Sequence, residues 1–224
     1  MKIAFQVVGR AGIGLVAFGV LLFLSAGTFA YWQGWAFLAA FTLSTMVPTG
    51  YLLVKAPEAV RRRMQVGPAA ETRPVQRAIV TVLFVLFPAI LIFGALDHRF
   101  GWSPVPTVIS MIGDLLVIGG LGLTMAVVIQ NGFAAANVTV ESGQQVVSTG
   151  LYRVVRHPMY AGTLVMTVGL PLALGSWWGL LVIVPVAVVL VLRILDEERL
   201  LERDLEGYRD YERMTRFRLV PRVW

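Results

Sequence analysis

The chain is dominated by long apolar stretches separated by short polar connections. Four of these stretches are 19 to 23 residues long, and about 20 helical residues are needed to cross the hydrocarbon of a bilayer. The pattern therefore predicts four membrane-spanning helices, over Ala11–Tyr31, Trp35–Val54, Ala78–Leu96 and Thr107–Ile129. A short turn at residues 32–34 is expected between the first two.

A fifth apolar block, Met159–Leu192, has 34 residues and is too long for one spanning helix. The sequence Gly175-Ser176-Trp177-Trp178 interrupts it. We interpret the block as a tight helical hairpin whose first arm is bent at Pro171 and is short for a full crossing. Residues 193–224 carry eight arginines and eight acidic residues, which predicts a solvated helix followed by a tail.

Composition agrees with a membrane fold. Apolar residues make up 57% of the 224 residues and charged residues 14%, and the mean hydropathy is +0.75. These values exclude a soluble globular domain, a disordered chain and a fibrous repeat. The predicted fold class is all-α: a polytopic membrane helical bundle with four spanning helices, a C-terminal helical hairpin (five to six membrane segments) and a cytoplasmic C-terminal helix and tail.

Basic residues predict the orientation of the bundle. In the predicted topology, 18 of the 19 Lys and Arg residues lie on one side of the membrane, and Arg99 alone lies on the other. Because basic residues concentrate in cytoplasmic loops, both termini and residues 55–77 are expected in the cytoplasm, with 97–106 outside. The net charge of +6 is then a topology signal that also favours contact with membrane lipids, and no nucleic-acid partner is expected.

Residue types exclude several kinds of site. The chain has no cysteine, so it can form neither disulfides nor thiolate metal sites, and it has no cysteine nucleophile. Its two histidines are 59 residues apart, and no metal site is predicted. The glycines at residues 119–122 match small-residue helix packing better than phosphate binding.

Two polar stretches, residues 146–162 and 193–211, flank the hairpin, which returns them to the same surface. Together they supply aromatic rings, a histidine, arginines and carboxylates. Each part has an ordinary interpretation: Arg156 as an interfacial anchor, or Arg193 and Glu197 as an i,i+4 ion pair. Their joint occurrence around one hairpin favours a pocket at the membrane face, since ionisable groups near membrane depth are costly and often functional.

The same two stretches carry an ordered motif. It reads Gly150-x-Tyr152-x-x-x-Arg156-His157-Pro158-x-Tyr160-x-Gly162, then an apolar hairpin, then Arg193-x-x-x-Glu197-Glu198 and Gly207-Tyr208-x-x-Tyr211. This combination resembles the integral-membrane methyltransferases, namely the isoprenylcysteine carboxyl methyltransferases and the related phospholipid N-methyltransferases. The resemblance covers about residues 130–222.

The resemblance implies a division into N-terminal transmembrane helices (1–130) and a C-terminal catalytic subdomain (131–224) that binds S-adenosylmethionine. It implies catalytic roles for Glu197 and for Arg193, which occupies the position that holds the acceptor carboxylate in the carboxyl methyltransferases. The implied cofactor-binding residues are Asn137, Gln144, Gln145, Val146, Val147, Tyr152, His157, Pro158, Met159, Tyr160, Glu197 and Glu198. The implied activity is methylation of the carboxylate of a prenylcysteine-like or other lipophilic acceptor that reaches the site from the membrane.

Three alternatives stay open. The acceptor could be a phospholipid, an amine or a thiol, as elsewhere in the same family. Steroid-reductase-like NADPH membrane oxidoreductases share a similar layout, but they typically show Pro-Asn-Tyr followed by glutamate where this chain has Pro158-Met159-Tyr160-Ala161-Gly162. A non-catalytic membrane protein or transporter is the third. The short N-terminal half is prokaryote-like, so the expected location is a prokaryotic inner membrane.

Overall fold

The computed structural model describes residues 2–134, 137–140 and 143–224. Across these residues the chain is helical and contains no strand, which confirms the all-α prediction. The α-helices are α1 (Lys2–Ala26), α2 (Trp32–Lys55), α3 (Pro57–Met64), α4 (Pro74–Phe100), α5 (Thr107–Gln130), α6 (Pro158–Ala173), α7 (Ile183–Asp204) and α8 (Tyr208–Met214). Short 3₁₀ turns are η1 (Pro68–Ala70), η2 (Gly150–Arg153) and η3 (Trp178–Val182).

Helix boundaries follow local chemistry. Pro57, Pro74 and Pro158 begin α3, α4 and α6, where proline needs no N–H partner and its fixed φ suits the first turn. Gly101 ends α4 in the left-handed conformation, with φ 64°, which glycine adopts without steric cost.

Five of the helical segments are long and apolar enough to cross a membrane: Ile3–Ala26, Trp32–Lys55, Pro74–Phe100, Thr107–Gln130 and Trp178–Asp204. Helix α6 has 16 residues and is shorter, as predicted for the first arm of the hairpin. Large apolar side chains such as Phe5, Leu24 and Val54 are at least three-quarters exposed. Such surfaces suit lipid, and the protein is an integral membrane protein.

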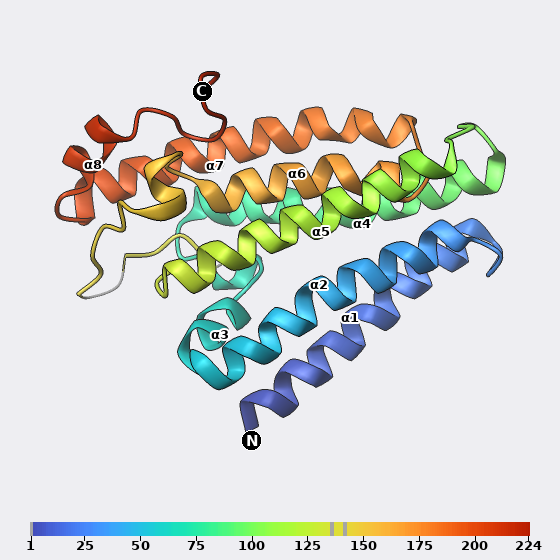
Figure 1. Ribbon diagram of the computed structural model, residues 1–224, viewed down its shortest axis with the longest axis horizontal. Coiled ribbons are helices and arrows are strands. Elements are labelled where there is room, and N and C mark those ends of the chain that lie inside the picture. Colours follow the sequence, from blue (N-terminus) through green and yellow to red (C-terminus); the bar gives the residue numbers. More distant parts are fainter. Residues whose placement is uncertain (1, 135–136, 141–142) are drawn as a thin grey trace.

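Helices α4 to α7 run roughly alongside one another, and the α1–α2 hairpin diverges from them toward the end that carries α3 (Figure 1). A buried cluster joins the two parts toward the opposite end, and it includes Leu22, Tyr31, Phe37, Leu91 and Leu174. The chain termini, α3 and α8 lie in the same half of the molecule, away from the α4–α5 and α6–α7 connections (Figure 1). Which end faces the cytoplasm remains a prediction.

Helices α5 and α6 pack at backbone contact. A Cβ atom on Gly120 of α5 would lie 2.5 Å from the carbonyl oxygen of Gly162 on α6, whereas a Cβ on Gly119 would meet nothing within 4 Å. A Cβ on Gly113 would lie 2.1 Å from the backbone nitrogen of Ala173. Small residues allow this approach in membrane helices, and of the glycines at 119–122 it is Gly120 that makes the contact.

The α6–α7 hairpin is fixed by polar contacts at its turn. The Ser176 hydroxyl donates to the buried carboxylate of Asp97 at the end of α4, and Ser103 donates to the same oxygen at 2.7 Å. The Tyr31 hydroxyl donates to the carbonyl of Leu174 at 2.7 Å. These bonds hold the turn against α4 and α2, so the other ends of α6 and α7 are placed together.

Two sequence predictions were wrong in detail. Residues 32–34 belong to the first turn of α2, and the α1–α2 connection lies at residues 27–31. The charged segment after residue 193 does not begin a separate solvated helix: α7 continues without a break to Asp204, with Arg193, Asp196 and Glu198 buried. These charges are accommodated because each finds an oppositely charged partner from another segment.

Candidate active site

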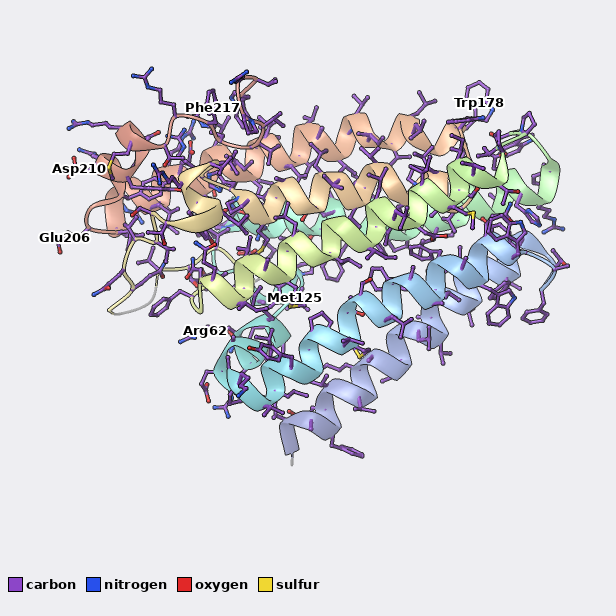
Figure 2. All side chains as sticks on the ribbon, in the orientation of Figure 1. Arg62, Met125, Trp178, Glu206, Asp210 and Phe217 are labelled. Atoms are coloured by element: carbon purple, nitrogen blue, oxygen red, sulfur yellow. The ribbon has the colours of Figure 1, made fainter. Side chains whose placement is uncertain are left out.

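A cavity of about 840 Å³, including its open mouth, lies at the end of the molecule where α6 begins and α7 ends. Oxygen and nitrogen atoms gather at this end, near the labelled Glu206 and Asp210 (Figure 2). Its walls come from the segment after α5, from η2, from the first turn of α6, from the end of α7 and from α8. Of the predicted cofactor residues, those that line it are Asn137, Gln144, Gln145, Val146, Val147, Tyr152, His157, Pro158, Met159, Tyr160 and Glu197.

Glu198, also predicted to bind the cofactor, lies behind the wall. It is 3% exposed and forms ion pairs with Arg156 at 2.9 Å and Arg218 at 2.7 Å. The His157 Nε2 atom lies 3.2 Å from the same carboxylate. Glu198 therefore anchors the pocket wall, and it is not among the residues that line the cavity.

Arg156 is buried between two carboxylates, Glu198 and Glu212. Its backbone N–H donates to the carbonyl of Phe217, and that of His157 donates to Arg218, both at 2.9 Å. The C-terminal tail thus pairs with the start of α6. Arg156 is a buried part of this framework and not an exposed interfacial anchor.

Tyr160 joins the pocket to Arg193. Its hydroxyl donates to Glu197 Oε2 at 2.5 Å and accepts from Arg193 Nε at 2.9 Å. The Arg193 guanidinium also lies 5.8 Å from the centre of the Tyr160 ring. This arrangement fixes the carboxylate of Glu197 at the pocket wall.

Arg193 lies outside the wall and is held from its other side by α4 and the loop before it. Its Nη1 atom donates to Gln76 Oε1 at 3.1 Å, and its Nη2 atom pairs with Glu71 Oε1 at 3.0 Å. Both partners are buried. The Arg193–Glu71 ion pair therefore joins residues that are far apart in the sequence. Through it Arg193 links α7 to the N-terminal half of the chain, which an i,i+4 pair with Glu197 alone would not do.

No motif in the sequence indicates a role for Glu71. Its second oxygen, Oε2, accepts from the backbone N–H of Val138 in the pocket wall at 3.2 Å, so one carboxylate holds both Arg193 and the wall. Next to it, Asp196 accepts from Gln76 and from Arg73, each at 2.6 Å. From the sequence, residues 55–77 were interpreted only as a basic signal of membrane topology. The available clue to their role in the site was the presence of Glu71 and Gln76 just before the predicted apolar span.

The pocket has an aromatic wall with one unsatisfied hydroxyl. Tyr152 accepts from Asn131 Nδ2 at 3.0 Å, and the Tyr211 hydroxyl donates to the Tyr152 carbonyl at 2.8 Å. The hydroxyl of Tyr208 is buried and has no hydrogen-bond partner among the described residues. Burial raises the pKa of Tyr152 and of Tyr208 above the ordinary value, so both remain neutral hydroxyls at pH 7.

These residues fit S-adenosylmethionine. Aromatic faces and the Glu197 carboxylate can hold a sulfonium cation, amide side chains can bind an adenine or amino-acid group, and the Tyr208 hydroxyl is available to a ligand. The described residues contain no group of three His, Asp or Glu side chains that could hold a metal ion.

The fold and the site define an integral-membrane protein with a polar pocket built on a C-terminal helical hairpin. Residues 108–206, which run from α5 to just past the end of α7, match the model of the phospholipid methyltransferase family. A comparison with curated proteins finds no match. The matched part includes Tyr160, Arg193 and Glu197, but neither Glu71 nor Tyr208.

Proposed function

We propose that this membrane protein is a methyltransferase that uses S-adenosylmethionine, bound in the cavity between α6, α7 and α8, and that it methylates a lipophilic acceptor that arrives from the membrane. The observation that carries the proposal is the Tyr160–Glu197 pair on an aromatic pocket wall, inside the segment that matches the family. The buried, unpartnered hydroxyl of Tyr208 supports it, because such groups cost free energy unless a ligand satisfies them.

When bound, S-adenosylmethionine supplies an electrophilic methyl group on a sulfonium cation. The residues of this chain would bind and orient it. Glu197, held by Tyr160, places a negative charge at the wall, while Tyr152 and Tyr208 provide ring faces. Pro158 and Met159 add apolar surface that excludes water.

Our first candidate for the acceptor is the carboxylate of a prenylcysteine-like acid. A carboxylate is already ionised at neutral pH, so no pocket residue has to act as a general base. The planar guanidinium of Arg193 suits a carboxylate, but it already pairs with Glu71. The acceptor must therefore compete with Glu71 for Arg193, and binding becomes an exchange of one carboxylate for another.

An amine acceptor is the second candidate, and the same ion pair favours it. Glu71 compensates the charge of Arg193, while Glu197 remains a carboxylate at the pocket wall. A carboxylate there can hold an ammonium group and take up the proton that an amine releases before it is methylated. The two candidates differ in whether Arg193 or Glu197 meets the acceptor.

An acceptor screen tests the proposal. Purified protein in detergent is incubated with radiolabelled S-adenosylmethionine and with matched prenylthioether compounds that end in a carboxylate, an amine or a thiol. We expect label in the organic phase with one of these end groups. Absence of transfer to all three, together with thermal stabilisation by NADPH instead of S-adenosylmethionine, would support the oxidoreductase alternative.

A further inference from the structure

A long apolar groove, here called the α1–α2 groove, lies between the second half of α1 and the first half of α2. Its volume is about 1690 Å³ including its open side, and no charged side chain lines it. Phe23 and Leu38 in the groove are 6% exposed, whereas Val20, Leu24 and Leu43 are more than half exposed. The groove is therefore open along the side that would face lipid.

Gly19 shows that the side chains of the protein do not fill this groove. It is one of the lining residues, and a Cβ atom on it would meet nothing within 4 Å. On the same helical hairpin, a Cβ on Gly34 would lie 2.9 Å from the ring of Tyr31. The two helices are thus in contact near their connection and leave open space beside Gly19. They are also the least buried of the five spanning segments.

The length of the α1–α2 groove matches one leaflet of a bilayer. Its lining follows α1 over the twelve residues from Leu15 to Gly27, which correspond to about 18 Å along a helix. One leaflet supplies about 15 Å of the roughly 30 Å hydrocarbon core. An acyl chain of that leaflet can therefore lie along the whole groove.

One end of the groove lies at the depth of lipid headgroups. The groove ends at the α1–α2 connection, which lies at the same end of the molecule as the α4–α5 connection (Figure 1). Three tryptophans at this end, Trp35, Trp102 and Trp178, are 47–54% exposed, and Trp178 is labelled there in Figure 2. Exposed tryptophans concentrate at the boundary between membrane and water.

Arg99, in the last turn of α4, places a cation at this end of the groove. Its side chain is exposed, and its Cζ atom would lie 3.4 Å from a Cβ on the lining residue Gly27. The guanidinium lies 5.7 Å from the centre of the Phe100 ring. Among the residues that the structure describes, no carboxylate lies within 4 Å of it. Arg99 is therefore available to an anion at the groove end.

A second copy of the chain does not supply that anion. The connections at this end, residues 27–31, 97–106 and 174–182, contain one acidic residue, Asp97. Asp97 is 1% exposed and accepts hydrogen bonds from two serines. A copy docked on the groove would thus bring no exposed carboxylate to Arg99. An anionic phospholipid carries both the charge and the hydrocarbon chain that the site matches.

We propose that one anionic phospholipid binds here, with its headgroup phosphate at Arg99 and one acyl chain in the α1–α2 groove. The lipid covers apolar side chains that α1 and α2 leave exposed, and it holds the hairpin against the end of α4. None of the groove's lining residues lines the cavity beside Glu197. Titration with S-adenosylhomocysteine therefore tests the proposed function separately, whatever the lipid result.

The experiment alters the two ends of the site one at a time. Arg99→Gln removes the cation, and Arg209→Gln, at an exposed position of α8, is its control with the same change in charge. Gly19→Leu fills the groove. Gly12→Leu is its control, because a Cβ on Gly12 also meets nothing within 4 Å and Gly12 does not line the groove.

Native mass spectrometry of the full chain in neutral detergent measures the binding of dioleoyl phosphatidylglycerol, dioleoylglycerol and glycerol phosphate. We expect phosphatidylglycerol to bind the wild type and both controls, and to bind Arg99→Gln and Gly19→Leu at least tenfold more weakly. Dioleoylglycerol, which lacks the phosphate, and glycerol phosphate, which lacks the chains, should bind all five proteins weakly. Phosphatidylglycerol should also raise the thermal midpoint of the wild type and the controls more than that of the two site variants, since a ligand of the folded state stabilises it.

Several results would overturn the proposal. Undiminished phosphatidylglycerol binding by either Arg99→Gln or Gly19→Leu would do so, because both ends of the lipid must be held. An equal loss in Gly12→Leu would show a general effect on α1. A dimer of the wild type that Gly19→Leu dissociates would assign the groove to a second copy. The thermal midpoint of each variant without lipid reports whether it is folded, and Arg99→Lys, which keeps the charge, should retain most of the binding.

Discussion

At the scale of single residues, the pocket depends on a chain of contacts through one hydroxyl. Tyr160 connects Glu197, at the pocket wall, with Arg193, which faces α4. Glu71 then connects Arg193 to Val138 in the wall on the other side. A change at any of these positions is therefore expected to reach both the cofactor and the acceptor sides.

Arg193 and Glu71 distinguish the two acceptor candidates. If Arg193 holds an acceptor carboxylate, Arg193→Lys should reduce turnover by roughly 30- to 1000-fold, because a bidentate charge-assisted contact contributes about 2–4 kcal/mol. Glu71→Gln removes the competing carboxylate and should lower KM for the acid. Steady-state kinetics on a prenylthioether acid measures both effects. Unchanged turnover in Arg193→Lys would favour the amine candidate.

Glu198 should contribute to stability more than to ligand contact. It is buried among Arg156, Arg218 and His157, and removal of one member of a buried ion-pair network costs about 3–5 kcal/mol. Glu198→Gln is expected to lower the thermal midpoint in detergent strongly. Exposed Glu206→Gln is the control. A variant with unchanged stability but no S-adenosylmethionine binding would make Glu198 a ligand contact after all.

At the scale of elements, the hairpin and the contact between α5 and α6 could be predicted from the sequence, because they depend on the length of the apolar segments and on small residues within them. The burial of the end of α7 could not be predicted in this way. A segment with many charges resembles a solvated helix, and its burial depends on partners such as Arg73, Glu71 and Arg156, which come from distant segments. Sequence spacing along one helix cannot show these tertiary pairs.

Two adjacent glycines test the α5–α6 contact. In Gly120→Ala the new methyl group would meet the Gly162 carbonyl at 2.5 Å, whereas in Gly119→Ala it would meet open space. Forced overpacking typically costs about 1–3 kcal/mol, so Gly120→Ala should unfold at a clearly lower temperature. Gly119→Ala should match the wild type within about 0.5 kcal/mol. Equal midpoints for both variants would contradict the packing.

At the scale of the whole molecule, the sequence predicted an all-helical membrane protein and most of the cavity lining. It did not predict that the loop between α3 and α4 completes the site. Glu71 and Gln76 lie outside the segment that matches the family and reach Arg193 only because the bundle brings α4 beside α7. The N-terminal half is therefore part of the site and not only a membrane anchor.

The orientation in the membrane is directly testable because the chain has no cysteine. Single cysteines at the exposed positions Pro104 and Val66 report on opposite ends of the bundle. The distribution of basic residues predicts that Pro104→Cys reacts with a membrane-impermeant maleimide in intact cells, and that Val66→Cys reacts only after permeabilisation. The reverse pattern would invert the topology.

Binding of S-adenosylmethionine in the cavity beside Glu197 is tested most directly by calorimetric titration of the purified protein. We predict that the wild type binds both S-adenosylmethionine and S-adenosylhomocysteine. Glu197→Gln should weaken the binding of S-adenosylmethionine at least tenfold, or by about 1.4 kcal/mol. The affinity for S-adenosylhomocysteine, which lacks the sulfonium charge, should fall by a smaller factor. Equal affinity of S-adenosylmethionine for the wild type and Glu197→Gln would contradict the account.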